Sequence, residues 1–373
     1  MNFRRELFKS SDPYAHSETD DVFLLAIKEV LDFHLNHCEA YKKLAEAEGF
    51  SLGELESIDD LHKIPAIPTA YLKSHFMLSV PEDQLLMKFT SSGTSGHPSH
   101  VGIDLGTGEL SLRMMLRLFS YYRLFSARPS NYIVLGYEPS MHNQTGVTKT
   151  AHGMTLLTPA LHREYALKST GRDYILNLEG IKNRLLSYAK SPFPVRFMGF
   201  PAYFLFMLEL LRDEGITLRL HPKSKVFLHG GWKQFYTQKA DKSVLYSMSE
   251  ELLGIPEQNF MDFYGPVEHP IIYADCPHHH FHVPVYARVV VRDPRTLKPV
   301  GYGTPGIVNL ISPLMGAMPL TSIMPDDLVV MHDGRDCPCG NPAPWFSILG
   351  RVGLEEIKTC AANAGDLLKG DAF

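Results

Sequence analysis

The stretch Thr90-Ser91-Ser92-Gly93-Thr94-Ser95-Gly96 consists entirely of hydroxyl-bearing residues and glycines. Glycine lets a backbone approach an anion closely, and hydroxyls together with backbone N–H groups can surround phosphate oxygens. No Gly-Lys-Ser/Thr sequence follows, so the stretch is not a Walker loop. We interpret it as a phosphate-binding loop inside a folded region; the alternative is an ordinary Ser/Gly connecting loop.

Outward from this loop, short β-rich runs alternate with helical patterns. The runs cover residues 132–135, 195–198, 225–228 and 260–264, and the helical patterns cover residues 110–124, 176–189 and 203–212. This alternation predicts an α/β fold with a mostly parallel sheet. Before the loop, helical spacing runs from residue 22 to residue 44, with Cys38 inside it and Gly49 as its stop.

After Glu268 the pattern changes to runs at 287–292, 306–311 and 328–331, joined by Gly/Pro turns that leave no room for helices. We expect an antiparallel β subdomain there. The predicted organisation is an α/β core over residues 1–270, a β-rich subdomain over 271–350 and a short tail over 351–373. Gly301-Tyr302-Gly303-Thr304-Pro305-Gly306 matches a dinucleotide-binding pattern, but a strand rather than a helix follows it, so we interpret it as a turn.

Composition excludes several classes of protein. The chain has 373 residues, 45% of them apolar and 21% charged, with a net charge of −5, so it has no overall attraction to nucleic acid. No run approaches the roughly 20 apolar residues of a membrane span, and the N-terminus lacks a secretory signal. Five cysteines, an odd number in a long chain, favour free, metal-bound or catalytic thiols in a reducing, cytoplasmic setting.

The phosphate loop resembles that of the adenylate-forming superfamily, and further matches follow in the family's order. Gly230-Gly231 resembles the adenine-binding turn, Tyr264-Gly265-Pro266-Val267-Glu268 the aromatic-Gly-x-Thr-Glu motif, Asp327 the ribose-binding aspartate, and Gly350-Arg351 the hinge arginine that also contacts ribose. Within the superfamily, the chain is most similar to LuxE-type acyl-protein synthetases, and the phenylacetate–CoA ligases are more distant. Gly230-Gly231-Trp232-Lys233 and the tract from His282 to Asp293 support that choice.

The resemblance implies ATP-dependent activation of a carboxylic acid, expected to be a fatty acid, as acyl-AMP. Ser92, Thr94 and Ser95 are expected to hold the β- and γ-phosphates, Glu268 to bind Mg²⁺ that bridges them, and Asp327 to accept hydrogen bonds from the ribose. Two features depart from the family. Val267 replaces a hydroxyl residue, and the 22 residues after Arg351 (352–373) leave no room for the usual C-terminal domain with its catalytic lysine. Lys358 and Lys369 are candidate substitutes without a spacing argument.

Cys360 lies in this tail. In LuxE-type proteins the acyl group passes from AMP to a cysteine near the C-terminus and then to a partner reductase, and a thiolate is a suitable nucleophile. The resemblance therefore implies that Cys360 carries the acyl thioester; the alternative is an idle thiol.

The remaining cysteines form a separate constellation. Cys337-Pro338-Cys339 is a Cys-x-Cys pair followed by Gly340, and Cys276 precedes a run of histidines at His278, His279, His280 and His282. Cys276, Cys337, Cys339 and one histidine would complete a tetrahedral, structural zinc site, with His282 the preferred ligand and His280 the second choice. The alternative is a set of free thiols beside a surface histidine run.

The apolar, aromatic stretch from Phe197 to Met207 is expected to line the acyl pocket in part and to form core in part. Three hypotheses follow for the function. The first is an acyl-protein synthetase that passes the acyl group to a protein thiol, with a reductase or carrier protein as partner. The second is a ligase that passes an acyl or aryl group to CoA or a carrier protein without Cys360, and the third is a zinc-stabilised scaffold that has lost catalysis.

Overall fold

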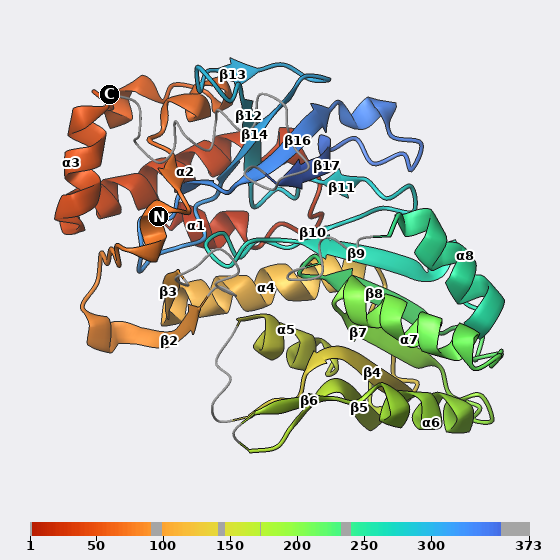
Figure 1. The fold of residues 1–373 in the computed structure, drawn as a ribbon. Coiled ribbons are helices and arrows are strands. Elements are labelled where there is room, and N and C mark those ends of the chain that lie inside the picture. The colour runs from red at the N-terminus through yellow and green to blue at the C-terminus, as the bar shows by residue number, and fades with distance from the viewer. Residues whose placement is uncertain (1, 91–98, 141–145, 172, 233–239, 352–373) are drawn as a thin grey trace. The chain divides into compact units, whose positions relative to one another are not determined.

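The computed structural model describes residues 2–90, 99–140, 146–171, 173–232 and 240–351 (Figure 1). The chain forms two compact units: unit 1 comprises residues 1–121 and 265–373, and unit 2 comprises residues 122–264. Unit 1 is therefore built from both ends of the chain, and unit 2 is inserted between them in sequence. The boundaries that the sequence suggested, after residues 270 and 350, remain predictions.

Unit 2 is an α/β unit. Its strands, hydrogen-bonded in the order β9-β8-β7-β4-β5-β6, are β4 (Ser130–Tyr137), β5 (Ala160–Ser169), β6 (Tyr174–Leu176), β7 (Val195–Gly199), β8 (Lys225–His229) and β9 (Phe260–Tyr264). Its helices are α5 (Gly146–Met154), α6 (Leu178–Tyr188), α7 (Pro201–Asp213) and α8 (Lys242–Leu253). All neighbouring strands are parallel except β5 and β6, which are antiparallel.

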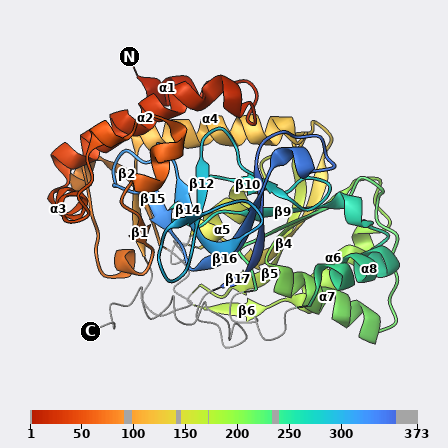
Figure 2. The same cartoon turned by 90° about the horizontal axis from the view of Figure 1, so that it is seen from above.

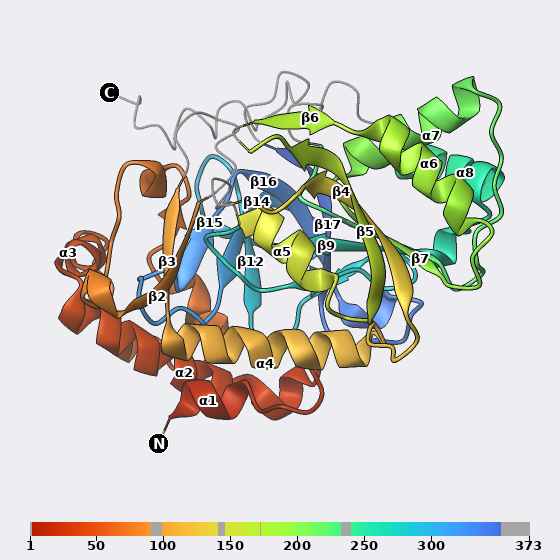
Figure 3. The same cartoon turned by 90° about the horizontal axis from the view of Figure 1, so that it is seen from below.

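Both faces of this sheet are covered, as the apolar character of its strands predicts. Ile133 and Leu135 of β4 belong to the large core that includes side chains of α6, α7 and α8. Val134, which points the other way, packs with Ala151 of α5. Figure 3 shows α5 on one face and α6, α7 and α8 on the other.

The carboxyl ends of the parallel strands meet at one edge of the unit 2 sheet. At the end of β7, Gly199 adopts φ 137°, and a Cβ atom there would lie 2.4 Å from the carbonyl oxygen of Leu135. After β8, Gly230 and Gly231 adopt φ 80° and 65°, in the left-handed region that glycine tolerates. This edge is where open α/β sheets bind their ligands.

Unit 1 is organised around an eight-stranded sheet in which β1-β15-β14-β16-β17-β11 are neighbours, while β12 pairs with β14 and β13. Its strands are β1 (Ile67–Pro68), β11 (Phe281–His282), β12 (Arg288–Arg292), β13 (Pro299–Val300), β14 (Pro305–Ile311), β15 (Ser322–Met324), β16 (Asp327–His332) and β17 (Trp345–Arg351). Unit 1 also contains the hairpin of β2 (Leu85–Thr90) and β3 (His100–Asp104), and the short strand β10 (Tyr273–Ala274).

The helices of unit 1 are α1 (Phe3–Leu7), α2 (His16–His37), α3 (Glu39–Ala47) and α4 (Leu105–Tyr121). Figure 2 shows α1 and α2 running beside α4. Arg4 anchors α1 by donating from Nε to the carbonyl of Pro313 (2.8 Å) and from Nη2 to that of Leu314 (2.6 Å). Among the described residues, no helix combines the length and the apolar character needed to cross a bilayer.

The α/β prediction is confirmed, and β9 has the predicted bounds. The turn interpretation of residues 301–306 is also confirmed, because Gly303 has φ 76° and a strand follows. The position of Cys38 within the first helix was predicted wrongly. Cys38 has an extended backbone (φ −126°, ψ 99°) and separates α2 from α3. The new helix α3 buries Tyr41 and Ala45.

Candidate functional site

The two residues predicted to bind ribose lie side by side in unit 1. Asp327 is the first residue of β16, Arg351 is the last of β17, and the strand register places them opposite each other. Nε of Arg351 is 3.3 Å from Oδ1 of Asp327, and the Arg351 side chain is half exposed. A carboxylate fixed by a guanidinium at an accessible strand end can still accept hydrogen bonds from ligand hydroxyls.

A β-bulge contributes to this pairing. Leu328 pairs with Gly350 and Val329 with Ile348, so Leu349 is an extra residue on β17. Because side chains alternate between the faces of a strand, one residue more or fewer here would turn Arg351 to the opposite face.

Glu268 is buried, with 6% of its surface exposed. Within the described residues, no hydrogen bond or ion pair reaches its carboxylate. Its carboxylate oxygens are not among the fully enclosed polar atoms, so a cation could reach them. Just before it, a Cβ atom on Gly265 would lie 2.6 Å from the carbonyl oxygen of Ile271, which explains why the motif has glycine at this position.

The other predicted nucleotide contacts lie on several elements. Thr90 ends β2 opposite His100, so the predicted phosphate loop connects the two strands of this hairpin. Ser91, Ser92, Gly93, Thr94, Ser95 and Gly96 lie outside the described residues, as does Cys360. Unit 2 carries Gly230, Gly231 and Tyr264, while Thr90, Gly265, Glu268, Asp327 and Arg351 belong to unit 1.

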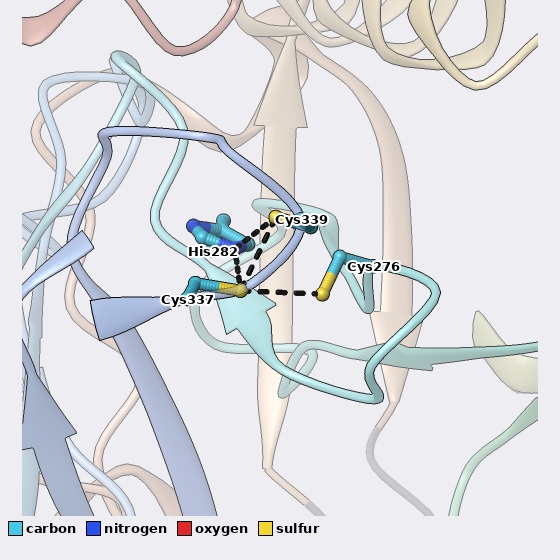
Figure 4. Close-up of side chains that lie close together, drawn as sticks. All are labelled: Cys276, His282, Cys337 and Cys339. Atoms are coloured by element: carbon cyan, nitrogen blue, oxygen red, sulfur yellow. Dashed lines mark hydrogen bonds between the residues drawn. The ribbon is translucent and has the colours of Figure 1, made fainter. Parts of the chain in front are cut away.

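Four predicted metal ligands come together in unit 1, although they are far apart in sequence (Figure 4). One ligand atom from each of Cys276, His282, Cys337 and Cys339 lies within 4.8 Å of the others. Sγ of Cys337 lies 3.7 Å from Sγ of Cys276, 3.2 Å from Sγ of Cys339 and 3.3 Å from Nε2 of His282. Tetrahedral Zn²⁺ with Zn–S near 2.3 Å and Zn–N near 2.0–2.1 Å places its ligand atoms roughly 3.5–3.8 Å apart. The four side chains therefore fit a zinc ion.

Hydrogen bonds orient these ligands. Nδ1 of His282 donates to the carbonyl of Ala343 (2.8 Å), which leaves the lone pair of Nε2 directed at the sulfurs. Backbone N–H groups of His278 and Asn341 donate to Sγ of Cys276 and Cys339, both at 3.4 Å. Donors aimed at sulfur stabilise thiolates, the form in which cysteine binds metal.

Burial opposes this stabilisation of the thiolates, because it favours the neutral thiols. It raises the pKa of the Cys276 thiol and raises the pKa of Cys337 to about 12. Burial also lowers the pKa of His282, so its imidazole is neutral at pH 7 and available as a ligand. The positive charge of a bound metal would reverse the effect on the thiols, as it does in metal–thiolate sites generally.

His280, the second ligand choice, has Nδ1 3.2 Å from Sγ of Cys337, but its ring stacks on Trp345 with centroids 3.6 Å apart. His332 stacks on the same indole, with centroids 3.9 Å apart. The geometry therefore favours His282 as the ligand. The part of Trp345 in this site was not predicted from the sequence. The available signal was one of only two tryptophans, placed shortly after the Cys-x-Cys pair.

The stretch expected to line the acyl pocket is mostly core. Phe197, Phe204 and Met207 are fully buried within unit 2. Phe200 follows β7 directly, and its ring lies 6.2 Å from that of His229 at the end of β8. Phe200 therefore lies at the sheet edge where a ligand is expected, whereas most other residues of the stretch lie in the core.

The family model of the acyl-protein synthetase LuxE matches residues 4–368. The chain belongs to the LuxE family. It is 25% identical over 340 residues to the long-chain-fatty-acid–luciferin-component ligase of Vibrio harveyi, and the match covers 90% of this chain and 85% of that one. It is 23% identical over 382 residues to the ligase of the same name from Aliivibrio fischeri, and that match covers 97% of each chain.

A solved ligase structure has a similar fold. An open conformation of 2-hydroxyisobutyryl-CoA ligase in complex with 2-HIB-AMP and CoA has a TM-score of 0.66 and 18% identity, covering 92% of this chain and 77% of the ligase. This likeness concerns the fold. Together with the family match it confirms the predicted adenylate-forming fold, and family membership confirms the predicted enzyme class, a ligase that activates an acyl group and transfers it.

Proposed function

We propose that this LuxE-family chain uses ATP to convert a long-chain fatty acid into acyl-AMP and then passes the acyl group to a protein thiol. The observation that carries the nucleotide assignment is the Asp327–Arg351 pair, held opposite each other at an accessible strand end. Fatty acid is the substrate class named for the relatives from Vibrio harveyi and Aliivibrio fischeri.

The first step joins the carboxylate to the α-phosphate. A carboxylate oxygen forms a bond to the α-phosphorus, the bond to the bridging oxygen of the β-phosphate breaks, and pyrophosphate leaves. Little covalent chemistry falls to the protein, so its work is to position the reactants and neutralise charge. We assign the β- and γ-phosphates to Ser92, Thr94 and Ser95, the ribose to Asp327 and Arg351, and the adenine to the Gly230-Gly231 turn.

Glu268 is the proposed Mg²⁺ ligand. Most of the residue is buried, and its carboxylate lacks a partner among the described residues, which suits a site completed by a cation. Mg²⁺ prefers carboxylate and phosphate oxygens and commonly uses one or two carboxylates together with substrate phosphates. When bound, the ion would offset the negative charge of the polyphosphate.

In the second step a thiolate attacks the acyl carbon and AMP leaves with both electrons of the broken bond. We assign the thiol to Cys360, from which the acyl group would pass to a partner reductase or carrier protein. The competing proposal is direct transfer to CoA or to a carrier-protein thiol. A thioester on the chain itself distinguishes the two.

The metal assignment is structural Zn²⁺ on Cys276, His282, Cys337 and Cys339. All four positions of a tetrahedral ion would be filled by protein, which leaves none for substrate. Metal analysis of the purified protein should give one zinc per chain. Cys339→Ala should lose the zinc, whereas Cys38→Ala, which removes a buried thiol outside the cluster, should keep it.

ATP–pyrophosphate exchange with a panel of fatty and aromatic acids tests the proposal. We expect exchange with long-chain fatty acids in the parent and in Cys360→Ser, while labelling of the chain by radioactive acid is lost only in Cys360→Ser. Cys38→Ala should keep both activities. Unchanged labelling in Cys360→Ser would overturn the carrier role, and no exchange with any acid in zinc-loaded protein would favour a scaffold.

A further inference from the structure

The strands β16 and β17 form a hairpin with a candidate site at each end. Asp327 and Arg351 lie opposite each other at its open end, and His332 and Trp345 pair at its closed end. The connecting residues 333–344 contain the Cys-x-Cys pair. β17 has seven residues, so the two ends are roughly 20 Å apart at about 3.3 Å per residue.

The connection between the strands has little freedom. A Cβ atom on Gly334 would lie 2.1 Å from the carbonyl oxygen of Pro342, so the two arms of the loop are in close contact. Nε1 of Trp345 donates to the carbonyl of Asp333 across the loop (3.1 Å). The loop therefore holds the first residues of β17 in one position relative to the end of β16.

The other two ligands come from outside the hairpin. His282 belongs to β11 and pairs directly with Trp345 of β17. Cys276 lies between β10 and β11, on the segment that follows Glu268. The four metal ligands thus tie together the hairpin, β11 and the segment after Glu268.

The segment between Glu268 and Cys276 also packs against the hairpin directly. The hydroxyl of Tyr273, on β10, lies 2.9 Å from Nε2 of His269. The ring of Tyr273 meets that of Phe346 on β17 edge to face, with centroids 5.3 Å apart. A change in the position of β17 would therefore shift the residues next to Glu268.

Register decides whether the open end of the hairpin is functional. The bulge at Leu349 sets Arg351 opposite Asp327, and a slip of one residue would move the arginine to the other face of the sheet. A metal bound to Cys337 and Cys339 in the loop and to a histidine on the neighbouring strand would oppose any such slip. It would act at the closed end, where all three strands meet.

We propose that zinc on Cys276, His282, Cys337 and Cys339 sets the register of the β16–β17 hairpin, and that zinc binding and nucleotide binding are thereby coupled. This inference rests on the proposed function, because it takes the carboxylate and guanidinium at the open end as the ribose contacts. Coupling between two sites is reciprocal: the factor by which zinc strengthens ATP binding is the factor by which ATP strengthens zinc binding. Measured couplings of this kind are typically about 5- to 150-fold.

The first test starts from the intact, zinc-loaded protein, and the second test shows whether the rest of unit 1 stays folded when zinc is removed. Zinc affinity is measured by competition with a chromogenic chelator, with and without saturating ATP and Mg²⁺. We expect ATP to strengthen zinc binding by about tenfold. Asp327→Ala should keep one zinc per chain but lose this effect of ATP, and Cys38→Ala should behave as the parent does.

The second test separates a local effect from a general one. Hydrogen exchange is followed in zinc-loaded protein and after chelation, comparing amides of β16 and β17 with those of α2 in the same unit. We expect chelation to speed exchange at least about tenfold in the hairpin and to leave α2 protected. His282→Cys replaces one zinc ligand by another. With zinc bound, its hairpin amides should be as protected from exchange as those of the zinc-loaded parent.

The outcomes distinguish the inference from the proposed function. If zinc-loaded protein binds ATP but its zinc affinity is the same with and without ATP, the coupling is overturned and the proposed function stands. Equal acceleration of exchange in α2 and in the hairpin would overturn the proposed control of register, because zinc would then stabilise the whole unit. If zinc-loaded protein binds no ATP, the proposed function and the coupling both fail.

Discussion

Arg351 and Asp327 form an ion pair across two adjacent strands, with Nε of the arginine 3.3 Å from Oδ1 of the aspartate. Each residue by itself resembles a ribose contact of the adenylate-forming enzymes. The structure adds that they are direct partners in the register of β16 and β17. An arginine at this position can both orient the carboxylate and donate to a ligand hydroxyl.

The first prediction concerns this pair. Asp327→Ala or Arg351→Ala should raise the Kd for ATP by about 10- to 100-fold, because a hydrogen bond to a charged group is worth about 1.5–3 kcal/mol. The double variant should lose less than the sum of the two, since the residues act together. Isothermal titration of each variant measures the effect.

Arg335→Ala is the matched control, because Arg335 pairs with Asp333 on the loop of the same hairpin but is 84% exposed. Exposed ion pairs contribute little, so ATP binding should be unchanged in this variant. Parent-like ATP affinity in Asp327→Ala would remove the basis of the nucleotide assignment.

The second prediction concerns Glu268. Glu268→Gln should lower Mg²⁺-dependent ATP–pyrophosphate exchange on the order of 100-fold, the usual loss when a charge-stabilising contact is removed from an active site. Its melting temperature without Mg²⁺ should be unchanged or higher, because a neutral amide costs less to bury than an unpaired carboxylate. Differential scanning calorimetry and the exchange assay give the two readouts.

Glu46→Gln, at an exposed position on α3, is the control and should alter neither property. A marked fall in the melting temperature of Glu268→Gln would show that the carboxylate is already compensated within the folded chain. In that case Glu268 would have a structural role.

The third prediction concerns pH. His34 is fully buried, with Nδ1 2.7 Å from Oγ of Ser79 and Nε2 3.2 Å from the carbonyl of Met315. Burial lowers its pKa from 6.5 to about 3. Between these values the unfolded chain binds a proton that the folded chain does not, so the free energy of unfolding falls as pH falls, by up to about 1.4 kcal/mol per pH unit.

His34→Asn removes this proton, so its unfolding free energy should depend less steeply on pH between about 6 and 4 than that of the parent. At pH 7 the variant should be less stable by about 1–3 kcal/mol, because Ser79 and Met315 lose a buried partner. Urea unfolding at several pH values measures both effects, and His75→Asn, at an exposed position, is the control. Equal slopes in parent and His34→Asn would contradict the prediction.

The fourth prediction concerns the backbone before Glu268. Gly265→Ala would place a Cβ atom 2.6 Å from the carbonyl oxygen of Ile271, so the turn must shift. We expect a loss of about 1–3 kcal/mol in unfolding free energy and a fall in exchange activity, since Glu268 lies three residues later.

Gly301→Ala is a matched control, because a Cβ atom there has no neighbour within 4 Å and the backbone is not in the left-handed region. It should be neutral in both assays. A fully active Gly265→Ala would mean that the turn tolerates the shift and that glycine is not required at this position.

Local patterns in the sequence predicted the helices α2, α4, α6 and α7, but fewer than half of the strands that the structure describes. The strands β7, β8 and β9 were found because they are short apolar runs, and the Gly230-Gly231 turn because left-handed backbone favours glycine. β5 was missed because charged residues interrupt its apolar pattern. One of them, Glu164, is buried and paired with Lys168 and Arg184, and Arg184 comes from α6.

By itself, the sequence determined the fold class, and it predicted the nucleotide motifs and the side chains that could bind a metal, since all of these depend on residue type and local spacing. Tertiary structure decided which residues meet. The partnership of Asp327 with Arg351 depends on strand register and on the bulge at Leu349, and the metal cluster depends on Cys276 and Cys337, 61 residues apart, reaching the same place. Strand register and contacts between residues far apart in sequence arise only when the strands pack together, so no local pattern encodes them.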